Sequence, residues 1–323
     1  MHLSVTTRTL SGIPILFAAL LAVASAQAPR SQTQSRQLPF GAEIQAEVSA
    51  QNRQQDPAFA ERVMRAFAAA YPGRLGEPVF RGSDWAVSLG GIVYYFAGGR
   101  MLREPLLSRA DEFLPHSFYP YPAELPEWKS PTAEQNERFR TIRERRQIQT
   151  LKHSQDFFDD LWGIHNHAQG SARMQRMDFL GKKLIVHYSI MEEIALVEMR
   201  ILEAAKTNAA VRAWIQGLQS ATGWNWRNIA ETASRSYHSY GAAVDVLSKP
   251  ERGKETYWLW TAQKNMDWWA VPYSRRQHPP QEVIKAFEAY GFTWGGKWLV
   301  YDTMHFEYRP EILILNGLPV LRE

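Results

Sequence analysis

The chain has 323 residues, 45% of them hydrophobic, and a formal net charge of +4; without a leader it suffices for one large domain or two modest ones. A charge excess this small argues against a nucleic-acid partner, because nucleic-acid-binding domains concentrate basic residues on one face. The sequence contains no cysteine, which excludes disulfides and thiolate metal ligands.

The first 28 residues are typical of a secretory signal peptide. Arg8 precedes an apolar run over residues 13–23, and small residues then follow in the Ala-x-Ala pattern. The run is too short for a spanning helix, which needs roughly 20 residues, so a membrane anchor is the weaker alternative. We therefore expect cleavage near Ala26 or Ala28, no stable membrane insertion afterwards, and a secreted protein that is periplasmic or extracellular.

Residues 29–55 are rich in Gln, Ser and Arg, which predicts a flexible leader without a core of its own. A helix is expected next. Asp56 is a good N-cap, Pro57 suits the first helical position, apolar residues recur on one face, and Pro72-Gly73 ends the pattern.

Residues 56–174 are expected to form an accessory region that is mainly helical and contains a β-hairpin. Gly90-Gly91 lies between apolar, aromatic runs, which is typical of a two-residue hairpin turn. Helical patterns resume over residues 132–162. His165 and His167 would point nearly opposite ways on a helix, so a metal site there is disfavoured.

Residues 175–323 are expected to hold the active core. A strongly amphipathic helix begins near His187, and short strand-like runs then replace long helices. Nine of the chain's 12 tryptophans lie between Trp214 and Trp298. The pairs Trp258/Trp260 and Trp268/Trp269 are expected to be partly buried core; the alternative is a groove for glycan or peptide.

Two of these runs carry residues suited to a metal site. In SYHSYGAAVDV, His238 precedes a turn at Gly241, and Asp245 alternates with apolar strand residues, so it faces away from the core. In MHFEYR, His305 and Glu307 share one strand face. If the strands pair, His238, Asp245 and His305 converge as the ligand set of a catalytic zinc site with an open fourth position. Taken singly, each histidine has a simpler interpretation as a packed or capping residue.

Asp302, three residues before His305, is the candidate catalytic base. A zinc-bound water needs a nearby carboxylate that takes its proton and can pass that proton to a leaving amine. The alternative is that Asp302 only caps the turn.

These residues resemble the zinc D-alanyl-D-alanine peptidases of the VanY and VanX type, a family that includes phage endolysins. The first family motif, Ser-x-His-x-x-Gly-x-Ala-x-Asp, is complete from Ser236 to Asp245. The second, an acidic residue, two residues and His, commonly followed by Phe-Glu, runs from Asp302 to Glu307. The best-known members have Glu where this chain has Asp302, whereas the endolysin-like branch has Asp, so the difference bears on which bond is cleaved. The resemblance covers roughly residues 224–310.

The resemblance implies an α+β fold in which a small antiparallel sheet with packed helices holds Zn²⁺, and it implies a peptidoglycan stem peptide as substrate. It also implies that an arginine upstream of the first motif holds a substrate carboxylate or carbonyl, here Arg227 or Arg235. We favour Arg227, since Trp224 and Trp226 would pack against it; a surface arginine stacked on tryptophan is the alternative. Ser236 either contacts substrate or simply closes the turn.

We therefore expect a secreted zinc metallopeptidase that acts as a D-Ala-D-Ala carboxypeptidase. The alternatives are a cell-wall endopeptidase and a non-catalytic wall-binding protein on the same fold. The sequence leaves open the role of the accessory region, the oligomeric state and the metal used in vivo.

Overall fold

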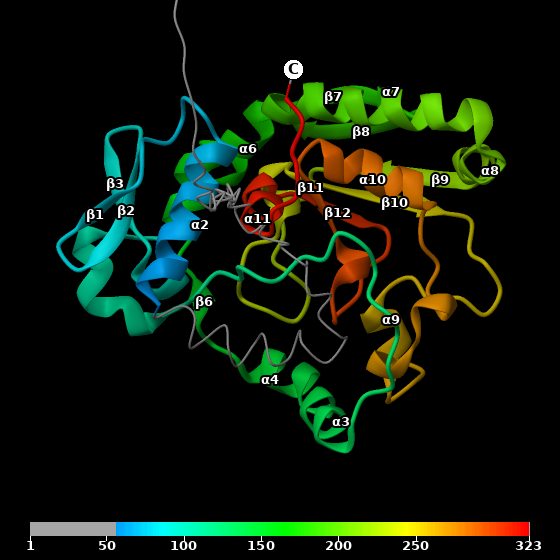
Figure 1. Cartoon of the computed structure of the whole chain (residues 1–323), viewed down its shortest axis with the longest axis horizontal. Helices are drawn as coiled ribbons and strands as arrows, with labels where there is room; N and C mark the ends of the chain where they lie inside the picture. The colour runs from blue at the N-terminus through cyan, green and yellow to red at the C-terminus, as the bar shows by residue number, and fades with distance from the viewer. Residues whose placement is uncertain (1–55, 323) are drawn as a thin grey trace, which may run out of the picture. The chain divides into compact units, whose positions relative to one another are not determined.

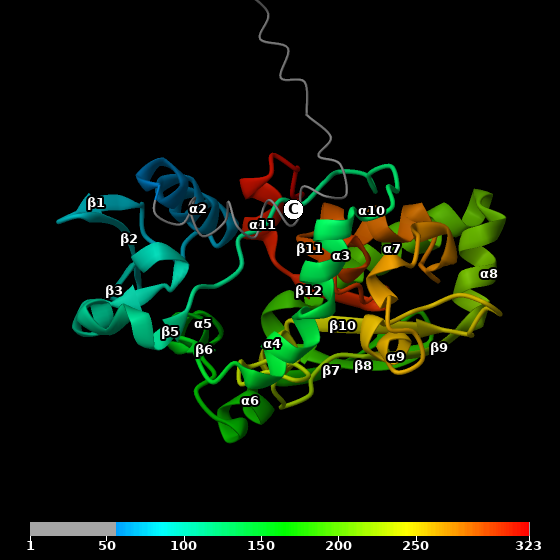
Figure 2. The same cartoon turned by 90° about the horizontal axis from the view of Figure 1, so that it is seen from below.

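The computed structural model describes residues 56–322. The described residues all belong to one compact unit, and Figures 1 and 2 draw them in colour. The predicted signal peptide (1–28) and leader (29–55) therefore lie outside the described residues. Between residues 56 and 322, none of the helices is both long and apolar enough to span a bilayer.

The N-terminal part of the described chain contains a four-stranded antiparallel sheet, a two-stranded parallel sheet (β5-β6) and several helices, of which α2 packs on the larger sheet. In chain order its elements are α2 (Pro57–Ala70), β1 (Val79–Arg81), β2 (Asp84–Leu89), β3 (Ile92–Tyr95), the 3₁₀ helix η1 (Ala97–Gly99), β4 (Leu102–Arg103), η2 (Glu104–Glu112), β5 (Phe113–Leu114), α3 (Ala133–Arg140), α4 (Ile142–Ile148), β6 (Lys152–His153), α5 (Asp156–Trp162) and α6 (His167–Arg173).

Helix α2 forms where the sequence predicts it. The Asp56 carboxylate accepts a hydrogen bond from the Ala58 amide at 2.9 Å, and Pro57 occupies the first turn, where a missing amide proton costs nothing. The apolar face of α2 packs against β2 and against the C-terminal helix α11 (Pro310–Leu315). The two ends of the described chain therefore share one hydrophobic core.

The predicted hairpin is confirmed, but it is the centre of a larger sheet. Gly90 and Gly91 have φ values of 57° and 84°, which suits the twist of a two-residue turn between β2 and β3. Strands β1 and β4 extend the hairpin on both sides to give the order β1-β2-β3-β4. These outer strands have only three and two residues, so the sequence offers too little alternation to predict them.

The C-terminal part has the α+β organisation with a small antiparallel sheet that the sequence predicts. Its elements are β7 (Met174–Phe179), β8 (Lys182–His187), η3 (Tyr188–Ile190), α7 (Met191–Thr207), α8 (Ala209–Gly217), β9 (Leu218–Thr222), η4 (Tyr237–Tyr240), β10 (Ala243–Ser248), α9 (Trp258–Ala262), η5 (Trp268–Ala270), η6 (Tyr273–Arg275), α10 (Gln281–Ala289), β11 (Phe292–Trp294), η7 (Gly295–Lys297), β12 (His305–Tyr308) and α11.

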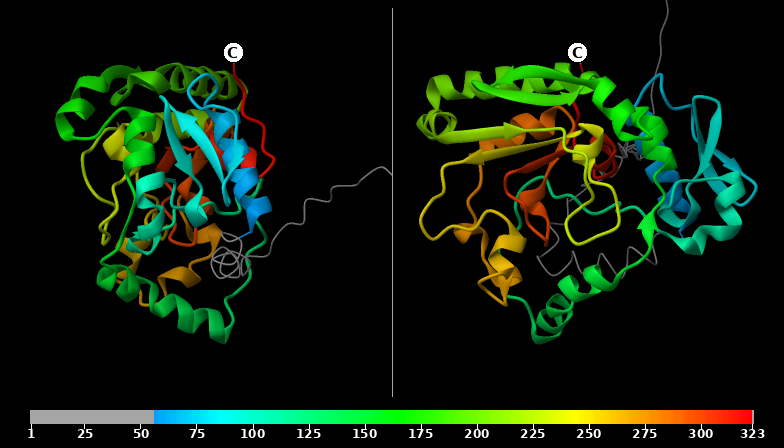
Figure 3. Two further views of the ribbon diagram at one scale, coloured as in Figure 1. Left: turned by 90° about the vertical axis from the view of Figure 1, so that its left-hand side faces the viewer. Right: turned by 180° about the vertical axis from the view of Figure 1, so that it is seen from behind.

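The central sheet of this part has the order β11-β12-β10-β9, with every neighbour antiparallel. Helix α10 packs between the sheet and α7, as the views in Figures 1 and 3 show. The rings of Phe287 on α10 and Phe306 on β12 stack with centroids 3.9 Å apart, and both side chains are fully buried. This packing fixes one face of β12 as core, so the alternate residues of β12 must face the other way.

A second hydrophobic cluster joins α3 to the tryptophan-rich segment. Phe139 of α3 is buried in it, and the Trp269 indole donates a hydrogen bond to the Asn136 side chain at 2.8 Å. As expected, Trp258, Trp268 and Trp269 are core residues, whereas Trp260 is 48% exposed. Since residues before and after position 175 share the main core, the predicted domain boundary stays a prediction.

Candidate metal centre

The pairing of β10 with β12 positions two of the three predicted ligands. Asp245 lies directly opposite His305 in this antiparallel register. Val244 and Val246 alternate with Asp245 and are buried, as is Phe306 next to His305. The apolar residues therefore anchor both strands in the core and turn Asp245 and His305 to the same polar face, as the alternation predicts.

The third ligand, His238, lies in the 3₁₀ helix η4, which Gly241 ends in the left-handed conformation with φ of 63°. A Cβ atom at this position would lie 2.4 Å from the Met174 sulfur and 2.6 Å from the His187 amide nitrogen. Only glycine satisfies both the backbone angle and the close approach. The turn that leads from His238 into β10 is thus set by Gly241.

The side chains of His238, Asp245 and His305 converge. His238 Nε2 is 3.2 Å from His305 Nδ1 and 3.2 Å from Asp245 Oδ2, and His305 Nδ1 is 2.7 Å from Asp245 Oδ1. Both histidines are at least 93% buried, and the possible ligand atoms of the three residues lie within 4.8 Å of one another. Within residues 56–322, these three side chains form the one group of at least three His, Asp or Glu residues whose ligand atoms lie close enough together to hold a metal ion.

The outer nitrogen of each imidazole faces an oxygen acceptor. His238 Nδ1 lies 2.5 Å from the carbonyl oxygen of Gly223, and His305 Nε2 lies 3.1 Å from Glu307 Oε1. Each outer N–H can therefore donate, which leaves His238 Nε2 and His305 Nδ1 with lone pairs that point toward Asp245. Two lone pairs and one carboxylate at this spacing repel one another unless a cation or protons lie between them. The donor set fits a divalent cation such as Zn²⁺.

Sequence reasoning placed Glu307 on the face of His305 but assigned it no role. The two-residue period of a strand was the signal that could have identified it, since residues i and i+2 share a face. The Gly223 carbonyl carries no such signal, because it comes from a turn after β9 and reaches His238 only in the folded chain.

The charges at this centre shift several pKa values. Burial alone would raise the pKa of Asp245, but His238 and His305 beside it hold that pKa well below its ordinary value. Burial acts to lower the pKa of His305, yet the carboxylates of Asp245 and Glu307 raise it well above its ordinary value. Both shifts favour positive charge next to the carboxylates of Asp245 and Glu307, and a bound cation would supply positive charge at the same place.

Asp302 lies close to Asp245 and His305 and is half-buried. Burial first, and then the charge of Asp245, raise the pKa of Asp302 to about 7. Its Oδ1 atom is buried without a hydrogen-bond partner among residues 56–322. Its carbonyl oxygen accepts a hydrogen bond from the His305 amide at 3.3 Å, which ties it to the start of β12. A carboxylate with one unpartnered oxygen and a pKa near 7 suits a group that gains and loses a proton.

A cavity of about 700 Å³ adjoins the centre. Asp302, His305 and Glu307 line it together with residues of the accessory region, including α4 and β6. This volume lies within the range of natural small-molecule and peptide pockets. The catalytic candidates therefore face a space that a substrate can enter.

The predicted substrate-binding residues also line this cavity. Arg227 is exposed, and its Nη1 donates to the Asn228 carbonyl oxygen at 3.3 Å. Ser236 is buried, and its hydroxyl accepts a hydrogen bond from the His238 amide at 3.3 Å, so it closes the turn while it lines the cavity. Arg235, the other candidate, pairs with Asp159 at 2.5 Å. That pairing leaves Arg227 as the arginine better placed for a ligand.

The tryptophan stacking predicted for Arg227 is found on Arg235 instead. Trp226 lies 4.6 Å from the guanidinium of Arg235, which stacks over it, and its other ring contact among the described residues is with His167. Trp226 therefore stacks with Arg235 and not with Arg227. Side-chain direction, which the spacing of the sequence does not reveal, decides which of the two arginines is held by tryptophan.

The other histidines among residues 56–322 have side-chain or backbone partners of their own. His165 Nε2 pairs with Asp160 at 3.3 Å, and the His167 ring packs against Trp224 and Trp226. His187 accepts a hydrogen bond from the Ser189 amide and stays buried.

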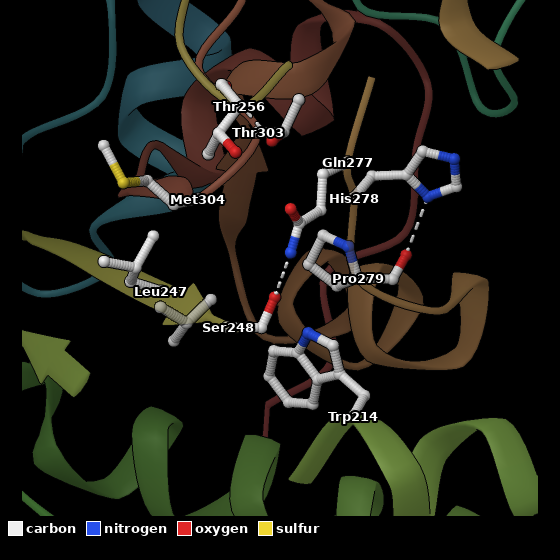
Figure 4. Close-up of a pocket in the computed structure, with 10 residues that line it drawn as sticks. Trp214, Leu247, Ser248, Thr256, Gln277, His278, Pro279, Thr303 and Met304 are labelled. Carbon is white, nitrogen blue, oxygen red and sulfur yellow. Dashed lines mark hydrogen bonds between the residues drawn. The ribbon is translucent and has the colours of Figure 1, made fainter. Parts of the chain in front are cut away.

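A second, much smaller void lies beside the C-terminal end of β10, at Leu247 and Ser248 (Figure 4). Its volume is about 10 Å³, enough for one water molecule at most. Trp214, Gln277 and His278 are among its lining residues, and Gln277 Nε2 donates to Ser248 Oγ at 2.8 Å. It is a packing defect rather than a binding site.

The fold and centre define a candidate metal-dependent hydrolytic site, and the family comparison agrees. Residues 230–308 match the family model described as D-alanyl-D-alanine carboxypeptidase, and this range contains His238, Asp245, Asp302 and His305. The match supports a peptidase of that family. Residues 63–118 match a domain of unknown function. No curated protein and no solved structure matches the chain significantly.

Proposed function

We propose that this protein is a secreted zinc peptidase that hydrolyses peptidoglycan stem peptides, as a D-Ala-D-Ala carboxypeptidase of the VanY, VanX and endolysin type. The observation that carries the proposal is the convergence of His238 Nε2, His305 Nδ1 and the Asp245 carboxylate next to the cavity that Asp302 lines. The match of residues 230–308 to the carboxypeptidase family supports the reaction class.

His238, Asp245 and His305 would hold the ion, with Glu307 and the Gly223 carbonyl fixing the two imidazole rings. Three protein ligands are the number that a catalytic zinc site uses. Bound there, Zn²⁺ would supply a Lewis acid that polarises a scissile carbonyl and acidifies a water molecule.

Asp302 is the proton carrier in this proposal. Its carboxylate takes the proton of the attacking water and then delivers that proton to the amine that leaves when the peptide bond breaks. Burial keeps the pKa of this group near neutrality, so both protonation states are within reach during one turnover.

Arg227 is the proposed clamp for the substrate. Its guanidinium lies at the cavity wall, where it can hold the terminal carboxylate of a peptide by charge-assisted hydrogen bonds. Ser236 keeps His238 in place through the turn, and its position in the cavity lining permits a contact to substrate.

The test joins metal content to activity. Purified wild type is expected to bind one equivalent of Zn²⁺ and to release D-Ala from a peptide that ends in D-Ala-D-Ala. His305→Ala is expected to lose both properties. His165→Ala is the matched control, because this histidine pairs with Asp160 and does not line the cavity. Full zinc loading and unchanged hydrolysis in His305→Ala would remove the proposal.

A cell-wall endopeptidase is the second candidate function. The cavity volume of about 700 Å³ favours it, because a terminal dipeptide alone would not fill this space. Mass spectrometry of digested peptidoglycan separates the two activities. Loss of one terminal residue indicates a carboxypeptidase, whereas released stems or cross-links indicate an endopeptidase. Co-sedimentation with purified cell wall without any change in its peptides would favour the non-catalytic wall-binding alternative.

Export is tested separately by the intact mass of the mature protein. Expression in a bacterial host is expected to give periplasmic or extracellular protein that lacks the first 26 or 28 residues. A full-length product that stays inside the cell would contradict this part of the proposal.

A further inference from the structure

One face of helix α4 lines the cavity. Ile142, Arg145 and Arg146 of α4 contribute to the cavity wall, and so does Gln149 just after the end of the helix. The spacing of i, i+3 and i+4 of the three helical residues is that of a single helix face. Figures 1 and 3 show α4 well apart from β12, although side chains of both elements line the cavity. The accessory region therefore supplies a wall that differs from the one with the metal ligands.

The neighbouring faces of α4 fix its orientation. Arg143 Nε and Gln147 Nε2 each lie 2.9 Å from Glu231 Oε1, which belongs to the same loop as Arg227. Arg146 contributes a third contact, since its guanidinium lies 5.3 Å from the centre of the Trp258 ring. Polar and cation–π contacts thus hold the helix in one rotation and keep the face with Ile142, Arg145 and Arg146 turned to the cavity.

The charge of Arg145 is not neutralised by a carboxylate, unlike the charges of three other cations that line the cavity. Arg235 pairs with Asp159, Lys297 with Glu288 and Arg309 with Glu311. Arg145 instead donates to the carbonyl oxygens of Thr141 at 3.4 Å and Arg138 at 3.1 Å. Among residues 56–322 it has no carboxylate partner within ion-pair distance, so its charge is available to an anionic ligand.

We propose that Arg145 forms a carboxylate subsite that makes the enzyme prefer peptides with a second free carboxylate, away from the scissile bond. The inference rests on the proposed peptidase function and assigns the accessory region a role in substrate selection. Arginine suits this task, because its planar guanidinium matches the two oxygens of a carboxylate.

The test uses a pair of peptides that both end in D-Ala-D-Ala and differ only in one internal residue, which carries a free carboxylate in one peptide and a carboxamide in the other. Wild type is expected to show about tenfold higher kcat/KM for the carboxylate peptide, mainly through KM, because one charge-assisted hydrogen bond is worth about that factor. Arg145→Gln is expected to reduce this preference several-fold and leave kcat for the carboxamide peptide unchanged.

Arg140→Gln is the matched control, since Arg140 is an exposed arginine on α3 that pairs with Glu137 and lies outside the cavity lining. Equal kcat/KM for both peptides with wild type would overturn the subsite, and so would an Arg145→Gln variant that keeps the full preference.

Binding separates the subsite from the peptidase activity. Calorimetry of both peptides with zinc-loaded Asp302→Asn is expected to show tighter binding of the carboxylate peptide. If wild type cleaves neither peptide but this binding difference persists, the proposed function fails and the subsite stands. If the two peptides bind equally, the subsite is wrong whatever the activity.

Discussion

Replacing Glu307 by glutamine tests whether the outer hydrogen bond of His305 tunes the metal site. The Glu307 carboxylate lies 3.1 Å from His305 Nε2 and 3.9 Å from the Arg309 guanidinium. Glutamine keeps the size of the side chain and offers an amide oxygen to the same N–H, but it removes the negative charge. The change therefore isolates the electrostatic part of this contact.

The expected loss follows from what the carboxylate does for the ring. A charged acceptor makes His305 Nδ1 a stronger donor to a cation and fixes the tautomer in which Nδ1 carries the lone pair. Removal of such a partner costs about 10- to 100-fold in metal affinity, or about 1.4 to 2.7 kcal/mol. Arg309 retains its pairing with Glu311, so the free energy of unfolding should change little.

Competition with a chromophoric chelator measures the zinc affinity of both proteins. Glu193→Gln is the control, because Glu193 accepts a hydrogen bond from Tyr308 on the same strand at 3.1 Å and does not touch a histidine. A Glu307→Gln protein with normal thermal stability and a zinc Kd within twofold of wild type would refute the reasoning. A similar loss in Glu193→Gln would show that the effect comes from strand packing.

The geometry of the metal centre also supports four other predictions. Asp302→Asn should lower kcat by about 10²- to 10⁴-fold with zinc content unchanged. In wild type, kcat/KM should fall at low pH, because Asp302 must be ionised to act as the base. Burial and the charge of Asp245 raise the pKa of Asp302 to about 7, whereas a bound cation lowers that pKa. The midpoint of the fall is therefore expected at or below about pH 7. Gly241→Ala should reduce the free energy of unfolding by more than about 2 kcal/mol in urea titrations, because the new Cβ would meet Met174 and the His187 backbone at positive φ. Chelation of the metal should lower Tm, since an ion at a free concentration of about 100 Kd stabilises the fold by about 2.7 kcal/mol.

Each of these has an outcome that contradicts it. If the Asp302→Asn enzyme stays active, Asp302 is not the proton carrier. A flat pH profile between 5 and 8 would argue that another group is the base. A Gly241→Ala protein as stable as wild type would mean that the turn relaxes at no cost. A Tm that is insensitive to chelator in a zinc-loaded sample would argue against His238, Asp245 and His305 as ligands.

Local sequence patterns sufficed for several elements. The Asp56-Pro57 start of α2 and the Gly90-Gly91 turn depend on contacts within a few residues, and both are as predicted. The alternation around Asp245 and His305 likewise assigned these residues to the polar face of their strands. The chemistry of two imidazoles and a carboxylate was enough to nominate the ligands, since few other tasks need that set.

Tertiary structure decided the rest, because it depends on which distant segments meet. The register that sets Asp245 opposite His305, the Gly223 carbonyl at His238 and the stacking of Trp226 on Arg235 each join residues whose relation no short-range period encodes. The same holds for α4: its sequence resembles an ordinary solvated helix, and only its docking on Glu231 turns two arginines toward the cavity. The sequence thus determined which groups are chemically able to act, whereas packing of the folded chain determined where their side chains point.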